Sequence, residues 1–301
     1  MNSGSLRAWG IAFGLAGVLG FSMRPILIKL SYEAAAVSPT TLIFLRMMLS
    51  LPFFAVIAWW LRRDEPRLTK RDWAAVFGLG MVGYYAASYL DFIGLQWIGA
   101  GVGRLIQFLY PTLVLLLSAM FLGKRPTQRE LVALVVSYAG VALVLSNHGA
   151  QEESRLFLLG AALVLASGLC YAVYLVMGSS MVKRIGSMRF TAYTMCVSTA
   201  PVLLQFLLLE PLSALDLPAE VWWYIGIMAV AGTVVPVFLV AEALKRIGAN
   251  HFALLGAVGP VSVAITSSLG LDEPLTILQA FGGVLVICGV LLVSLKPSGG
   301  R

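Results

Sequence analysis

The feature that most constrains this chain is a series of ten apolar segments, each close to the length that crosses a lipid bilayer as a helix. About 30 Å of hydrocarbon takes about 20 helical residues, and a helix satisfies its own backbone hydrogen bonds there. The segments are Trp9–Ser31, Pro39–Leu61, Trp73–Phe92, Gly101–Leu122, Leu131–Ser146, Leu156–Met181, Phe190–Leu209, Val221–Leu244, Phe252–Leu271 and Thr276–Leu295. The sequence therefore predicts an all-α polytopic membrane protein with ten transmembrane helices.

Composition supports a lipid environment for most of the surface. Only 12% of the 301 residues are charged, whereas a soluble domain carries roughly a quarter. The net charge of +7 does not indicate a nucleic-acid partner, because the basic residues fall in short loops and form no stripe along a phosphate backbone. The three cysteines lie inside apolar segments without metal-ligand spacing, so we expect no metal and no cofactor.

The distribution of lysine and arginine predicts the orientation, since cytoplasmic loops retain these residues. With a cytoplasmic N-terminus, the outer loops hold Arg155 alone. The inner loops and tails then hold sixteen basic residues, namely Arg7, Arg62, Arg63, Arg67, Lys70, Arg71, Lys124, Arg125, Arg129, Lys183, Arg184, Arg189, Lys245, Arg246, Lys296 and Arg301. We expect a multi-pass protein of the inner (cytoplasmic) membrane with both termini in the cytoplasm.

An internal repeat divides the chain into residues 1–150 and 151–301. Shifting the sequence by 149 positions aligns Trp73 with Trp222 and Pro111 with Pro260, and the tripeptide starting at Ile98 with the one starting at Ile247. Each copy holds five predicted helices. Because five is odd, the second copy enters the membrane from the opposite side, and inverted repeats of this kind favour a substrate site near the bilayer midplane, at their interface.

The pattern resembles the EamA-type members of the drug/metabolite transporter superfamily. The residues that carry the resemblance are Trp9-Gly10, Arg46 after Pro39, the two aligned prolines, the stretches around Gly140 and Gly289, and the segment Asp272–Val293. One departure is Lys124-Arg125, where the family has an acid after helix 4; the second half keeps Glu273. The resemblance implies ten helices, efflux of metabolites, often amino acids, and a central cavity formed by helices 1, 3, 4, 6, 8 and 9.

Four charged residues fall within the outer half of predicted spans. A charge costs ~2.5–3.5 kcal/mol or more at the bilayer centre, so Arg24, Arg46, Asp91 and Arg104 are candidates for function. We expect Asp91 to pair with one arginine, which leaves positive potential for a substrate carboxylate. The alternative is a fixed ion-pair network between helices, and this reading is stronger for Arg46 because helix 2 lies outside the family's cavity set.

Other polar and aromatic residues recur at helical spacing on the helices of the expected cavity. A ligand pocket with a few placed polar groups fits this set, although tyrosines also pack between helices or anchor at the membrane interface. The candidate substrate-binding residues are Tyr84, Ser88, Asp91, Arg104, Gln107, Tyr110, Tyr171, Tyr174, Thr233, Ser262 and Thr266.

The candidate gating or coupling residues are Arg24, Arg46, Pro111, Glu242, His251 and Pro260. Pro111 and Pro260 fall well inside spans, where proline frees a carbonyl group and can break a helix that lines a cavity. Glu242 and His251 flank an expected loop between helices 8 and 9. They form a possible proton-coupling pair, or Glu242 simply pairs with Lys245 or Arg246 one turn away.

Several functional classes compete with a transporter. The chain lacks HExxH, GxSxG and phosphate-loop motifs, so we expect no enzyme activity. A channel-like facilitator is the second rival, and a transporter of nucleobases, sugars or lipid-linked compounds is the third. The expected partners are the lipid bilayer and a small-molecule substrate, with protons as a candidate coupling ion. Glycine pairs such as Gly99 and Gly103 allow close helix packing or a homodimer.

Overall fold

The computed structural model describes residues 3–62, 67–123, 126–146, 152–256, 258–271 and 276–294, and every regular element in these ranges is helical. Eight segments are long and apolar enough to cross a membrane, and two shorter apolar helices, Val258–Gly270 and Ile277–Leu292, follow them. The predicted all-α fold with ten helical spans is confirmed. Lys124 and Arg125, Asp272 and Glu273, and the chain ends lie outside the described residues.

Six of the ten spans are single helices, and four are divided or run together. The single ones are α1 (Ser3–Ala34), α2 (Pro39–Leu61), α7 (Gln128–Ser146), α8 (Glu152–Ile185), α9 (Ser187–Leu209) and α13 (Ile277–Ser294). The third span consists of α3 (Lys70–Gly80), η1 (Met81–Ala86) and α4 (Ala87–Gly94), and the fourth of α5 (Ala100–Gln107) and α6 (Tyr110–Leu122). The second half continues with η2 (Leu212–Leu215), α10 (Ala219–Ala229), η3 (Val230–Val234), α11 (Val235–Gly256) and α12 (Val258–Gly270).

Local sequence explains where several helices begin and end. Ser38 caps α2 by accepting a hydrogen bond from the Thr41 amide, and Pro39 occupies the first turn, where its missing amide costs nothing. Thr69 and Asp72 form a reciprocal capping box at the start of α3. Gly186, with φ of +83°, makes the tight connection between α8 and α9 in a backbone conformation that other residues rarely adopt.

Both halves contain a widened π-helical turn at the same place in the repeat. The turn η1 begins at Met81 and η3 begins at Val230, which is 149 residues later. In η3 the hydroxyl of Thr233 donates to the carbonyl of Met228, five residues back, at 2.9 Å. Because π-turns often occur at functional sites, their repetition marks this depth of the bundle for closer inspection.

The proline of the fourth span stands just after a helix break and not in a helix interior. Helix α5 ends at Gln107, and Pro111 is the second residue of α6. Proline fits this first turn because an amide there has no helical partner anyway. The carbonyl of Leu109 accepts from both the amide and the hydroxyl of Thr112, which satisfies the backbone at the break. Pro260 is the third residue of α12, and residue 257, between α11 and α12, lies outside the described residues.

The loop expected between Leu244 and Phe252 is absent, because α11 runs without interruption from Val235 to Gly256. The expectation was wrong, and ion pairs from Glu242 to Lys245 and Arg246, at 2.9 Å and 3.2 Å, explain how the helix persists through this polar stretch. The equivalent stretch of the first half, Leu95–Gly99, does form a turn between α4 and α5.

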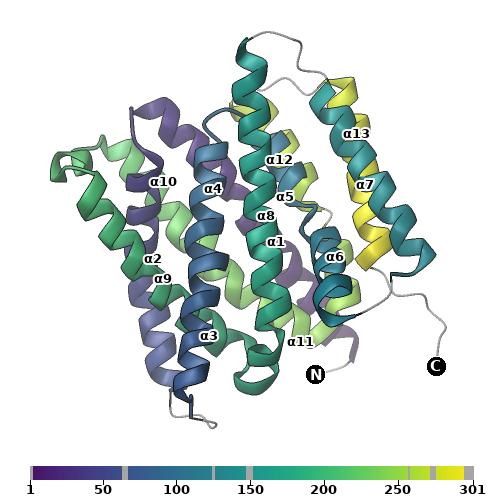
Figure 1. Ribbon diagram of the computed structural model, residues 1–301, viewed down its shortest axis with the longest axis horizontal. Helices are drawn as coiled ribbons and strands as arrows, with labels where there is room; N and C mark the ends of the chain where they lie inside the picture. The colour runs from purple at the N-terminus through teal and green to yellow at the C-terminus, as the bar shows by residue number, and fades with distance from the viewer. Residues whose placement is uncertain are drawn as a thin grey trace.

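Helix pairs at equivalent positions pack in equivalent ways. Helices α7 and α13 lie side by side at one edge of the bundle, and α2 packs against α9 toward the other (Figure 1). A methyl group on Gly140 would lie 2.6 Å from the Gly282 carbonyl, and one on Gly289 would lie 2.7 Å from the Ala133 carbonyl. These two contacts are related by the 149-residue shift, so the halves meet across a pseudo-twofold axis.

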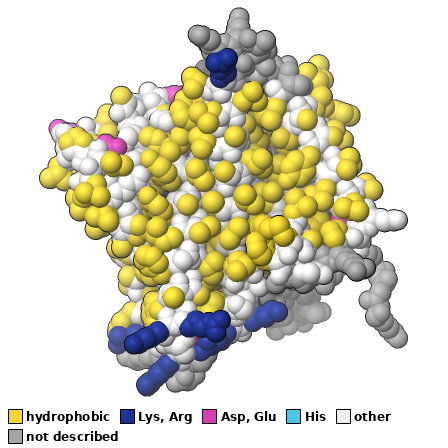
Figure 2. All heavy atoms as spheres, in the orientation of Figure 1, with side chains coloured by type: hydrophobic (Ala, Val, Ile, Leu, Met, Phe, Trp, Pro, Cys, Tyr) yellow, Lys and Arg dark blue, Asp and Glu magenta, His cyan; other side chains and the backbone are white. Residues whose placement is uncertain are grey.

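The two ends of the bundle carry opposite charge. Figure 2 shows a broad hydrophobic band, with lysine and arginine gathered along its lower edge and acidic side chains at the upper left. We call the lower end the basic face; its exposed side chains are Arg62, Arg67, Lys70, Arg71, Lys183, Arg184, Lys245 and Arg246. The acidic face is the opposite end, with exposed Glu33, Asp216 and Glu220.

Candidate functional site

A cavity of about 230 Å³ lies among the helices of both halves. Ten of the seventeen candidate residues line it, namely Arg24, Arg46, Tyr84, Ser88, Asp91, Arg104, Gln107, Tyr110, Tyr171 and Thr233. The widened turns η1 and η3 contribute Tyr84 and Thr233, and the helix break after α5 contributes Phe108. The cavity therefore lies where both halves depart from regular α-helix.

Arg46 lines this cavity, although helix 2 lies outside the set that the family resemblance implied. Its side chain is only 1% exposed. One terminal nitrogen, Nη2, donates to the hydroxyl of Ser88 at 2.8 Å, and the guanidinium lies 5.4 Å from the centre of the Phe92 ring. Helix α2 thus holds a rigidly placed cation against α4.

Asp91 lies among the three arginines without a direct ion pair. Its carboxylate lies within electrostatic range of Arg24, Arg46 and Arg104, and close to the side chain of Gln107. Gln107 also accepts from Nη1 of Arg104 at 3.1 Å. In the described chain no arginine nitrogen comes within 4.0 Å of the Asp91 carboxylate, so the expected direct pairing does not form here. Gln107 fills the space between acid and base instead.

Each of the three arginines leaves one donor without a partner. The Nε atoms of Arg24, Arg46 and Arg104 are buried and make no hydrogen bond within the part of the chain that the structure describes. An unsatisfied buried donor costs about 1–3 kcal/mol, and more when the group is charged. Three guanidinium groups around one cavity concentrate positive charge that an oxyanion can offset.

Aromatic rings close one side of the cavity. Tyr110 meets Tyr171 edge to face at 5.5 Å, and Tyr84 meets Tyr174 in the same way at 5.1 Å. Tyr174 does not line the cavity; it stacks on Phe190 at 5.3 Å, one layer behind. Tyr174 and Phe190 belong to a buried cluster with Val76 and Tyr193, so the rings pack helices α3, α8 and α9 together on this side.

Several other candidates lie away from the cavity. The hydroxyls of Ser262 and Thr266 donate to carbonyls of their own helix, at 2.8 Å and 2.7 Å, and Thr266 is exposed. Pro111 follows the helix break after α5, and neither Pro111 nor Pro260 lines the space. Glu242 forms the ion pairs expected of an interfacial acid. The side chain of His251 lies outside the described residues, so no Glu242–His251 pair is described.

The residues missed by sequence reasoning are mostly apolar. They are Val18, Phe21, Phe54, Gly83, Ala87, Phe108, Met195, Val237, Val240, Phe252 and Gly256. No sequence signal separates such side chains from those that face lipid or a neighbouring helix. The 149-residue shift would have found some of them, because Val18 and Ser167, Arg46 and Met195, and Asp91 and Val240 are equivalent pairs that all line the cavity.

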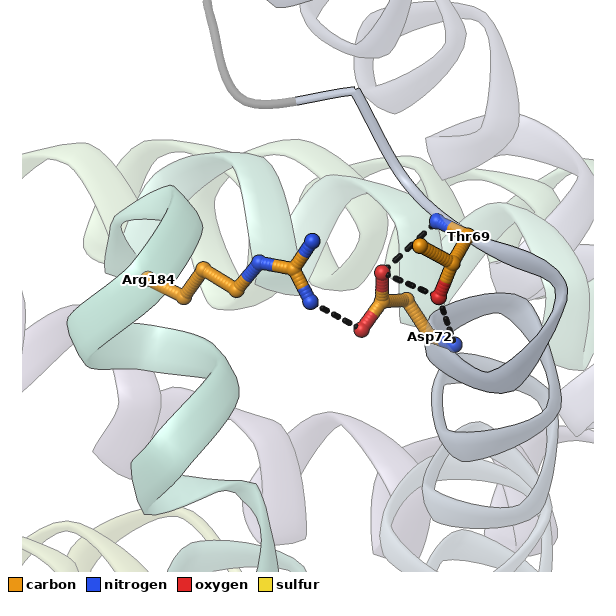
Figure 3. A network of polar contacts seen from close by, with 3 residues as sticks. All are labelled: Thr69, Asp72 and Arg184. Carbon is orange, nitrogen blue, oxygen red and sulfur yellow. Dashed lines mark hydrogen bonds and ion pairs between the residues drawn. The ribbon is translucent and has the colours of Figure 1, made fainter.

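A second polar site ties the two halves together at the basic face. Nη1 of Arg184, near the end of α8, lies 2.5 Å from the Asp72 carboxylate at the start of α3 (Figure 3). The other carboxylate oxygen of Asp72 accepts from the amide and hydroxyl of Thr69, at 2.7 Å and 2.8 Å. The capping box thus orients the acid toward Arg184. Among the described residues, no group of three or more His, Cys, Asp and Glu side chains could hold a metal ion.

Comparison with known proteins gives a consistent picture. The model of the EamA-like transporter family matches residues 8–146 and again residues 158–295. The uncharacterized transporter YcbK of Bacillus subtilis is 31% identical over 300 residues, covering 96% of this chain and 95% of that protein. The threonine/homoserine exporter RhtA of Salmonella typhimurium is 28% identical over 224 residues, covering 73% and 68%.

A solved crystal structure shares the fold. It matches with a TM-score of 0.63 and 18% identity, and the match covers 95% of this chain and 96% of the other. At that identity the likeness concerns the fold alone. The two family matches cover both halves of the chain, and the helical segments are long and apolar enough to cross a membrane repeatedly. The chain therefore belongs to the EamA-like transporter family and is a multi-pass membrane protein.

Proposed function

We propose that the protein is a secondary transporter that exports small metabolites, amino acids or related compounds, across the cytoplasmic membrane by alternating access. The observation that carries this proposal is the single cavity lined by equivalent positions of both halves, such as Asp91 and Val240. A site on the axis between inverted repeats can open to either face when one half moves against the other.

The size and chemistry of the cavity support a small substrate. A cavity of about 150 Å³ holds benzene, so about 230 Å³ accepts a metabolite of moderately larger size. Guanidinium groups match the planar, two-oxygen geometry of a carboxylate, and amino acids carry one. The name of the relative RhtA, a threonine/homoserine exporter, points to the same class. We propose that the ten cavity-lining candidates contact the substrate, with Arg24, Arg46 and Arg104 nearest its acidic group.

The contacts at the basic face fit a conformation that is closed on that side. The Arg184–Asp72 ion pair joins the second half, residues 151–301, to the first, residues 1–150. The Tyr174–Phe190 layer packs beneath it. We propose that this face is cytoplasmic, because inner loops retain basic residues, and that both contacts separate when the cavity opens toward the cytoplasm.

Counterflow in proteoliposomes tests this proposal. Vesicles that contain the purified protein and are loaded with unlabelled threonine, homoserine, aspartate or another small metabolite are placed in a trace of the labelled compound. A carrier accumulates the label transiently in a manner that depends on internal substrate. An open channel equilibrates it without such an overshoot, and an enzyme converts it chemically. Absence of overshoot for every metabolite tried, with folded protein present, would contradict the proposal.

A further inference from the structure

The charge of the cavity narrows the substrate class further than the proposed function does. Four charged side chains line it, Arg24, Arg46, Arg104 and Asp91, and the other lining side chains are neutral. The sum is therefore +2 in a space of about 230 Å³. In an apolar surrounding such a charge attracts anions strongly, because Coulomb energies rise as the local dielectric constant falls.

Among the described residues, the second half lines the cavity with no acid that could neutralise this charge. The positions equivalent to the three arginines and Asp91 are Val173, Met195, Ala253 and Val240, all apolar. Glu242, one turn beyond Val240 on α11, pairs with Lys245 and Arg246. The excess positive charge therefore comes from residues of the first half, and the equivalent residues of the second half do not offset it.

The partners already formed inside the cavity favour an anion over a zwitterion. Among the described lining residues Asp91 is the only acid that a substrate ammonium group could meet, and it already lies within electrostatic range of three guanidinium groups. An ammonium group would also face three guanidiniums. A ligand with two acidic groups brings two sets of acceptor oxygens to the three guanidinium groups of Arg24, Arg46 and Arg104 that line the cavity.

We propose that the cavity selects small organic acids that carry two carboxylates and a net negative charge, in preference to neutral amino acids. This inference rests on the proposed transport function and specifies its substrate class. It also distinguishes this chain from what the name of its relative RhtA states, since threonine and homoserine are neutral overall. Within the cavity, Arg46 is fixed by Ser88 and Arg104 by Gln107, so Arg24 keeps the most freedom to adjust to the ligand.

Four compounds with four-carbon skeletons separate charge from size. Succinate, aspartate, asparagine and threonine carry net charges of −2, −1, 0 and 0 near neutral pH, and each is tested by counterflow and by the thermal-unfolding shift of the purified full chain. We expect succinate to exchange fastest, with asparagine and threonine slower by at least about tenfold, the ratio expected when one charge-assisted hydrogen-bonded group is lost.

Variants on helix α1 supply matched controls. Arg24→Gln removes one positive charge from the cavity and should lower succinate exchange by about tenfold to a hundredfold. Arg24→Lys keeps the charge but loses the paired donors of the guanidinium group. Its rate of succinate exchange should lie between those of Arg24→Gln and the unsubstituted protein. Lys29→Gln removes a charge from the same helix outside this cavity, and it should leave the order of the four compounds unchanged.

The outcomes separate this inference from the transport function. If asparagine or threonine exchanges as fast as succinate, the charge selection is wrong while the transporter stands. If no compound exchanges but succinate alone raises the unfolding temperature, and Arg24→Gln abolishes that shift, the anion site is supported and transport of this class is contradicted. If neither succinate nor aspartate gives exchange or a shift while asparagine or threonine gives both, the inference is overturned.

Discussion

The two halves of the molecule share their packing but differ in the chemistry they bring to the cavity. Gly140 against Gly282, and Gly289 against Ala133, make the same close helix contact on either side of the axis. Both halves also carry a widened turn at the same depth, η1 and η3. Yet all four charges of the cavity come from the first half.

This difference shows which residues carry the fold and which carry recognition. Gly140 and its equivalent Gly289 are glycine in both copies, because a side chain at either would meet a carbonyl oxygen of the facing helix. Cavity positions have no such constraint, so one copy can hold Arg46 and Asp91 while the other holds Met195 and Val240. A symmetric scaffold thereby presents an asymmetric site, with a charged wall from the first half and an uncharged wall from the second.

The largest effect should come from disturbing the shared packing. Gly140→Leu and Gly289→Leu place side chains within 3 Å of carbonyl oxygens on α13 and α7, which cannot retreat without separating the helices. We expect each to destabilise the protein by about 3 kcal/mol or more, seen as loss of monodisperse protein and a lower unfolding temperature in detergent. Gly226→Leu, where no atom lies within 4 Å of the added carbon, is the control. Two unequal effects would show that the packing is not symmetric.

A smaller effect on stability, but a large one on transport, should follow from replacing a charged cavity residue of the first half by its uncharged equivalent in the second half. Arg46→Met introduces the residue found at the equivalent position and removes the 2.8 Å hydrogen bond to Ser88. We expect counterflow to fall by about tenfold to a hundredfold, the value of a charge-assisted hydrogen-bonded group. The matched change in the other wall, Met195→Leu, conserves volume and polarity and should alter the rate by less than about threefold. Equal losses would mean that the walls do not differ in role.

A modest effect is expected at the contact that joins the halves on the basic face. Arg184→Gln breaks the pair with Asp72 but keeps the capping box that Asp72 forms with Thr69. Because Arg184 is 41% exposed, the loss of stability should stay below about 1 kcal/mol.

The same variant should let the cavity open more often toward the basic face. The readout is the modification rate of a cysteine placed at Ser167, a cavity residue, with Cys170, Cys196 and Cys288 replaced by alanine. We expect a severalfold faster reaction with an impermeant thiol reagent added on the basic side. Lys183→Gln, an exposed neighbour, is the control and should leave the modification rate unchanged. An unchanged rate in Arg184→Gln as well would show that the Arg184–Asp72 ion pair does not hold the basic face closed.

The smallest effect should be at Glu242, whose equivalent in the first half is Ile93. Its ion pairs with Lys245 and Arg246 are partly exposed, and such pairs contribute about 0.3–0.5 kcal/mol. We expect Glu242→Gln to change the unfolding temperature by no more than about a degree or two and to leave counterflow within twofold at every imposed proton gradient. A lost response to that gradient would restore Glu242 as a coupling residue.

The fold could be read from the sequence because two strong signals agree. Span-length apolar segments and the 149-residue repeat each require long helices in two copies. The places where the chain departs from regular α-helix were harder to predict. The turn at Leu95–Gly99 and its helical counterpart in α11 share the run Ile-Gly-Ala, and the ion pairs of Glu242 are present in the second stretch alone.

The cavity could be predicted in its polar part only. Arg24, Asp91 and Arg104 stand out because charge is costly in a membrane, whereas Phe54 and Met195 resemble any lipid-facing or packed residue. Arg46 was underrated because the family's cavity set omits helix 2. Ser262 and Thr266 have the right spacing but donate back to their own helix, an option open to any serine or threonine in an apolar segment.

Two-sided access to one cavity residue tests the account most directly. A single cysteine at Ser167, in a chain without its native cysteines, is exposed to an impermeant thiol reagent on one side of the vesicle membrane or on the other. One cavity between two moving halves predicts modification from either side, and protection from both by the compound that shows counterflow. Modification from one side alone in every condition, or reaction that the transported compound never slows, would contradict a shared cavity that opens to each face in turn.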